Sequence, residues 1–200
     1  MPIHTIFEDQ NGIQALTVTK GTFIPGMVTT AFTTALSIIN KTIGGDAPRL
    51  GAMISYQHDT SAKKATLQKI ESAEFCHRIA HTNTAHLWSN VEPANRGIKV
   101  LVSLTGSMMK ARVNIGDGTS HVMGFIPVTS QAEAEMCLIV IKSKLYRFMV
   151  QSCRYSASIP AALFKALPGV DLTRLWTDAE LYAHFNLTQE EIDLIEMTVK

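Results

Sequence analysis

Basic and polar side chains gather in one stretch near the middle of the chain, residues 98–128. An apolar run at residues 98–102 predicts a strand buried on both faces, and a second strand is predicted at residues 122–128. Two strands that hold a polar loop are a common way to present side chains to a partner. Taken singly, each polar residue here is more often a solvated surface side chain. The polar candidates of this segment are Ser107, Lys110, Arg112, Asn114, Thr119, Ser120 and His121.

Charge is unevenly distributed along the chain, although the formal net charge is only +1. Residues 96–165 contain nine lysines and arginines, among them Lys99, Lys144 and Arg147, against three acidic residues. Residues 171–200 contain two basic and seven acidic residues. A basic middle predicts an anionic partner for that region, and the alternative is ordinary variation of surface charge.

Motifs for catalysis are absent from the sequence. There is no P-loop and no Gly-x-Ser-x-Gly motif, and the basic region lacks the paired carboxylates of a metal-dependent nuclease. Four potential zinc ligands, Cys76, His77, His81 and His86, lie close together in the sequence. Their segment has the pattern of a strand, in which residues four apart are too distant to share a metal easily. We therefore expect structural histidines, no metal and no cofactor.

Cellular location is indicated by three features of the sequence. The three cysteines form no Cys-x-x-Cys pair, and the N-terminal segment lacks a secretory signal pattern. No apolar run approaches the roughly 20 residues that cross a membrane as a helix. These features predict a cytoplasmic protein without a membrane partner.

Helices and strands are both predicted along the chain. Helical patterns cover residues 27–43, 130–155 (with a bend at Ser143) and 161–167, and a strand pair covers 75–79 and 85–89. Thr177 and Thr188 each open a short helix with a capping box. The expected class is α+β: a small mixed or antiparallel sheet with packed helices and a C-terminal helical hairpin. We expect one domain over residues 1–170, with an acidic helical hairpin appended over 171–200.

The C-terminal segment carries a recognisable run: LP at 167–168, VDLT at 170–173, WTD at 176–178, ELY at 180–182, Phe185, LT at 187–188 and EEI at 190–192. This run resembles the end of the target-recognition domain of adenine-specific DNA methyltransferases from type II restriction–modification systems. Residues 99–100, 114–116 and 134–150 are similar to the recognition strands of that domain and to the helix that follows them. The resemblance spans most of the chain, loosely before about residue 90 and more firmly after it.

The catalytic half of those enzymes has no counterpart here. The chain contains no Pro-Pro pair, hence no motif to engage a flipped adenine, and no glycine-rich loop for S-adenosylmethionine. The resemblance implies a non-catalytic module that reads duplex DNA, with contacts drawn from the polar candidates above together with Lys99, Lys144 and Arg147. The alternative is a protein-interaction module that docks a methyltransferase or restriction subunit and confers or blocks specificity. Its docking face would be Trp176, Tyr182 and Phe185, which we expect instead to pack onto the body.

Overall fold

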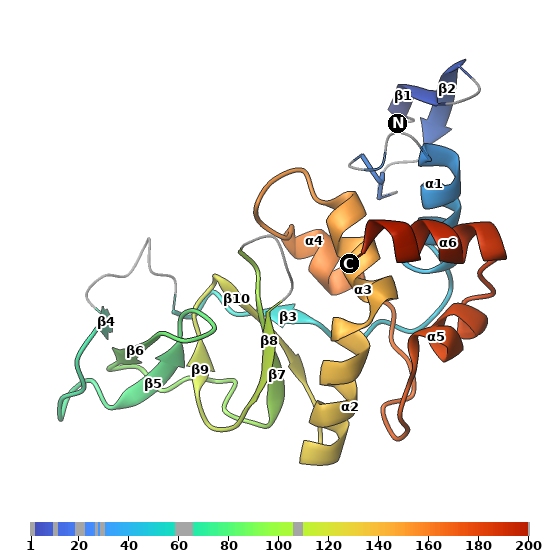
Figure 1. The fold of residues 1–200 in the computed structure, drawn as a ribbon. Helices are drawn as coiled ribbons and strands as arrows, with labels where there is room; N and C mark the ends of the chain where they lie inside the picture. Colours follow the sequence, from blue (N-terminus) through green and yellow to red (C-terminus); the bar gives the residue numbers. More distant parts are fainter. Residues whose placement is uncertain are drawn as a thin grey trace.

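The computed structural model describes residues 3–9, 12–18, 23–26, 28, 31–58, 66–105 and 110–199. Strands β1 (Ile3–Asp9) and β2 (Gly12–Val18) form an antiparallel hairpin at the N-terminal end. Two four-stranded sheets occupy one side of the molecule and the helices gather on the other (Figure 1). This combination confirms the predicted α+β class.

The central sheet contains β3 (Met53–Ile54), β10 (Met123–Pro127), β7 (Lys99–Ser103) and β8 (Ala111–Asn114), in that order. Every neighbouring pair is antiparallel. All five residues of β7 are buried, as its apolar run predicted.

The smaller sheet contains β4 (Leu67–Gln68), β6 (His86–Ser89), β5 (His77–Ala80) and β9 (Gly118–Thr119), in that order. Strands β5 and β6 form the predicted antiparallel pair, whereas β5 and β9 run parallel. One sheet is therefore antiparallel and the other mixed, so both arrangements left open by the sequence occur.

Helices cover one face of the central sheet. Ser143 separates two of them: the first ends at Lys142, and the Ser143 hydroxyl then accepts a hydrogen bond from the Tyr146 amide of the second, which confirms the predicted bend. The Phe164 ring packs so closely on β10 that a Cβ at Gly124 would lie 2.3 Å from it. The six helices of the described chain are α1 (Phe32–Lys41), α2 (Gln131–Lys142), α3 (Lys144–Cys153), α4 (Ala161–Ala166), α5 (Asp178–His184) and α6 (Gln189–Thr198).

The acidic C-terminal helices begin as predicted. Thr177 and Thr188 both form complete capping boxes, each with the glutamate three residues later. The aromatic residues Trp176, Tyr182 and Phe185 are buried in the same hydrophobic core as helices α1 to α4. The C-terminal helices therefore share one hydrophobic core with the rest of the described chain, and these three side chains pack onto the body as expected.

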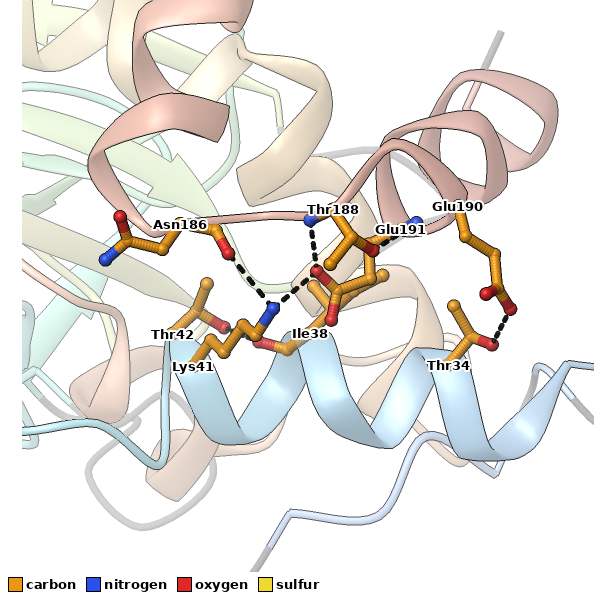
Figure 2. A network of polar contacts seen from close by, with 8 residues as sticks. All are labelled: Thr34, Ile38, Lys41, Thr42, Asn186, Thr188, Glu190 and Glu191. Carbon is orange, nitrogen blue, oxygen red and sulfur yellow. Dashed lines mark hydrogen bonds and ion pairs between the residues drawn. The ribbon is translucent and has the colours of Figure 1, made fainter.

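A polar link joins α1 to the start of α6 (Figure 2). Lys41 Nζ lies 2.7 Å from Glu191 Oε2 and donates to the main-chain oxygen of Asn186 at 3.0 Å. Thr34 adds a hydrogen bond to Glu190, with 2.8 Å between Oγ1 and Oε1. Segments from opposite parts of the sequence are thus held together by charge as well as by apolar packing.

The two faces of β7 have different neighbours, because alternate residues of a strand point to opposite sides. Val100 and Val102 join the core beneath the helices. Leu101 instead belongs to a second, small core with Ala80, Met123 and Phe125. Since Ala80 lies in β5, this face of the central sheet packs against the smaller sheet. We call the contact between the two sheets the sheet junction.

Candidate functional site

Lys99 lies inside the sheet junction with only 2% of its surface exposed. Its Nζ donates to the main-chain oxygens of Asn95 at 2.5 Å and Gly97 at 3.1 Å. Burial lowers the pKa of Lys99 to about 8; the Asp117 carboxylate opposes this shift, and Arg96 adds to it. Lys99 therefore anchors the loop that precedes β7.

Asn114, Thr119 and Ser120 are also buried at the sheet junction. Asn114 Nδ2 donates to Asp117 Oδ2 at 2.8 Å, and Thr119 Oγ1 accepts from Asn95 Nδ2 at 2.7 Å. The Ser120 hydroxyl lies 3.1 Å from His81 Nδ1. These hydrogen bonds satisfy Asn114 Nδ2, Thr119 Oγ1 and the Ser120 hydroxyl, which would otherwise be costly to bury, whereas the buried Oδ1 atoms of Asn95 and Asn114 have no partner among the described residues.

Burial of Lys99, Asn114, Thr119 and Ser120 argues against their expected contact with DNA, which stays a prediction. The sequence places them on strands beside an apparent loop, but the smaller sheet covers the face that they occupy. Their side chains are buried and bond to the loops around the sheet junction.

Arg112 and Lys110 remain accessible at the edge of the same face. Arg112 is half-buried, and its Nε donates to the main-chain oxygen of Asn83 at 3.1 Å, in the turn between β5 and β6. This hydrogen bond orients the guanidinium plane, and within the described chain its terminal Nη atoms have no hydrogen-bond partner. Lys110 is exposed just before β8, where its main-chain oxygen accepts from Ser103. Positions 110 and 112 project on the same side because they are two apart on an extended chain.

The other four candidates do not all gather at this edge. His121 is half-buried near His81, whose pKa is lowered by burial and then by the charge of His121. Lys144 and Arg147 lie on α3 in the helical layer, where Lys144 forms an ion pair with Glu196. Ser107 lies outside the described residues.

Three residues that were not among the expected DNA contacts share the side of Arg112. Cross-strand partners in an antiparallel pair point to one face, and the register pairs Arg78 with Trp88 and Ala80 with His86. Ala80 faces Leu101 across the sheet junction, so Arg78, Trp88 and His86 lie on the side that faces the central sheet. The signal that could have found His86 and Trp88 is the predicted strand at 85–89, because alternate residues of a strand point to the same face. We call Arg78, His86, Trp88, Lys110 and Arg112 the junction face.

The proposed zinc ligands have other surroundings. His81 contacts Ser120, the His86 ring packs on Trp88, and Cys76 is an exposed free thiol. Throughout the part of the chain that is described, no three histidine, cysteine, aspartate or glutamate side chains gather closely enough to hold a metal ion. None of the described helices combines the length and the apolar character needed to span a bilayer.

Comparison with known proteins identifies no family for the chain. No protein-family model matches it, and no curated protein matches it either. The function must therefore be inferred from the residues and their geometry.

Proposed function

We propose that the protein is a non-catalytic module that binds duplex DNA through the junction face. The observation that carries the proposal is the geometry of Arg112. A main-chain carbonyl orients its guanidinium, while the paired terminal amines stay available for a ligand. A planar pair of donors held in this way suits bidentate bonding to a phosphate or to the O6 and N7 atoms of guanine.

Charge around Arg112 supports an anionic ligand. Lys110 is exposed beside it, and Arg78 lies on the facing sheet with half of its side chain exposed. Asp117, whose Oδ2 forms an ion pair with Arg78 Nε at 3.9 Å, is buried and hydrogen-bonded to Asn114. Exposed cations with a shielded carboxylate favour binding of a polyanion.

The resemblance to methyltransferase target-recognition domains agrees with this ligand, and the absence of their catalytic motifs favours a module without chemistry of its own. A methyl-transfer assay with S-adenosylmethionine and duplex DNA should therefore give no product. We also propose a cytoplasmic location, because the three cysteines are free thiols and Cys76 is exposed. The competing protein-docking function loses its main support, since Trp176, Tyr182 and Phe185 are buried.

Fluorescence anisotropy with a labelled duplex across a salt series tests the proposal. The double variant Lys110→Ala/Arg112→Ala should bind about tenfold more weakly or worse, and its salt slope should fall by about 2, since each phosphate contact contributes about 0.9. Lys142→Ala/Lys165→Ala is the matched control, because it removes two exposed cations from α2 and α4. Absence of binding by the wild-type protein at low salt, or equal affinity of the two double variants, would refute the proposal.

A further inference from the structure

Two aromatic side chains on the junction face lie outside both hydrophobic cores. Trp88 is half-buried and His86 is exposed, and neither belongs to the cluster beneath the helices or to the cluster at the sheet junction. The indole N–H of Trp88 donates to no residue in the described chain. The other tryptophan, Trp176, is buried in the core with its Nε1 bonded to the main-chain oxygen of Asp171. Core packing thus accounts for Trp176 and leaves Trp88 unexplained.

His86 and Trp88 hold one another in an edge-to-face contact. Their ring centroids are 5.7 Å apart and their planes meet at 84°. In an edge-to-face pair the edge of one ring contacts one face of the second ring. The first ring keeps both of its faces free of this contact, and the second ring keeps one. Whichever ring supplies its edge, Trp88 keeps at least one flat face that His86 does not cover, and the contact holds the indole at low entropic cost.

Cations flank this aromatic pair. Arg78 is the cross-strand partner of Trp88, so their Cβ atoms are close neighbours on one face. Arg112 reaches the turn that leads into β6, at the end of the pair occupied by His86. An aromatic surface between two arginines matches the chemistry of a nucleotide, which is a flat base with phosphates on both sides.

We propose that Trp88, oriented by His86, forms a stacking surface for a base displaced from the duplex, with Arg112 and the half-exposed Arg78, which also lies 3.9 Å from Asp117, holding its flanking phosphates. The inference rests on the proposed DNA-binding function and adds to it the state of the DNA that is bound. A base stacked in an intact duplex presents only its edges in the grooves, so it reaches this surface only by leaving the stack. Unstacking is least costly at a mismatch, and such a duplex is the preferred ligand.

The experiment compares a fully matched duplex with the same duplex carrying one mispaired base, by anisotropy at fixed low salt. Wild-type protein should prefer the mispaired duplex by about 5- to 100-fold, the range expected for one stacked base. Trp88→Leu should lose most of this preference, and Trp88→Phe should retain it because the ring remains. Tyr155→Leu is the control, since it removes an aromatic side chain that is 68% exposed and follows α3 in the helical layer. Circular dichroism checks that each variant is folded.

Fluorescence supplies a second measurement that does not depend on replacing Trp88. The chain has two tryptophans, so Trp176→Phe leaves Trp88 as the sole tryptophan. Its emission should be quenched when the mispaired duplex binds, as base stacking brings the rings into contact. Binding of DNA without quenching, or equal affinity for both duplexes, would refute the stacking surface while leaving DNA binding intact. Failure to bind either duplex would refute the proposed function itself.

Discussion

Replacement of Lys41 or Glu191 should destabilise the protein through the link between α1 and α6. Glu191 is 3% exposed, and its Oε2 accepts from Lys41 Nζ and from the Thr188 amide, both at 2.7 Å. Burial alone raises the pKa of Glu191, but hydrogen bonds from Lys41, Thr188 and Ser37 outweigh it and hold the pKa below its usual value. The carboxylate is therefore charged at neutral pH and depends on its partners.

The size of the effect follows from burial. Loss of one partner from a buried ion pair lowers the free energy of unfolding by about 3–5 kcal/mol. The Lys41 side chain is 32% exposed, so solvation of the remaining charge makes the loss smaller here. We expect Lys41→Met and Glu191→Gln each to lower the free energy of unfolding by about 2–3 kcal/mol. At 2–4 °C per kcal/mol for a chain of this size, Tm should fall by about 4–12 °C.

A double-mutant cycle isolates the pair, with unfolding in urea followed by circular dichroism. The double variant Lys41→Met/Glu191→Gln should lower the free energy of unfolding by about 1–2 kcal/mol less than the two single variants do together. The reason is that the double variant leaves no charge unpaired, whereas each single variant does. A matched control is Lys142→Met, an exposed helix-end lysine on α2. Additivity within about 0.5 kcal/mol would refute the reasoning.

The coupling should also depend on pH. The pKa of Glu191 is lower in the folded than in the unfolded state, so its contribution is complete above the ordinary value of 4.5. It is lost as the pH falls through the folded-state pKa. The coupling energy should therefore be constant between pH 7 and pH 5 and should decline only below about pH 4.5. A decline that begins near neutrality would contradict this assignment.

Two further predictions concern the sheet junction and the core. The pKa of Lys99 is about 8 in the folded state and 10.5 when exposed, so unfolding takes up a proton between these values. The free energy of unfolding, measured by urea denaturation, should therefore rise by about 1–3 kcal/mol from pH 8 to 10.5. If the free energy of unfolding of Lys99→Met rises as steeply with pH, Lys99 is not the cause. Gly124→Ala should cost about 1–3 kcal/mol, since its Cβ would lie 2.3 Å from Phe164. Phe164→Leu in the same chain should recover part of that loss, and no recovery would mean that the clash lies elsewhere.

Local features of the fold were predictable because their signals are local. The two capping boxes need only a threonine and a glutamate three residues apart, and both formed around Thr177 and Thr188. The bend at Ser143 and the buried strand β7 depend likewise on neighbouring residues. Ser130 begins α2 in a similar way, because its hydroxyl accepts a hydrogen bond from the Glu133 amide.

The candidate site was predicted less well because its exposure depends on distant pairing. Whether Lys99 and Asn114 face solvent is decided by the smaller sheet, which forms when β5 pairs with β9 about 40 residues further along the chain. Nothing in the local pattern of residues 98–128 reveals that cover. Alternation along β6 could place His86 and Trp88 on one face, but only the β5–β6 register and the packing of Ala80 on Leu101 show that this face and Arg78 lie on the side of Arg112.

The link between Lys41 and Glu191 has a consequence for synthesis of the protein. It joins residues 150 positions apart, and Leu194 and Ile195 of α6 complete the core that Ile38 and Ile39 of α1 begin. During translation α1 leaves the ribosome long before α6 exists, with its apolar side chains uncovered. We expect this core to close only after α6 has emerged, and apolar surface that stays exposed until then favours aggregation of the nascent chain.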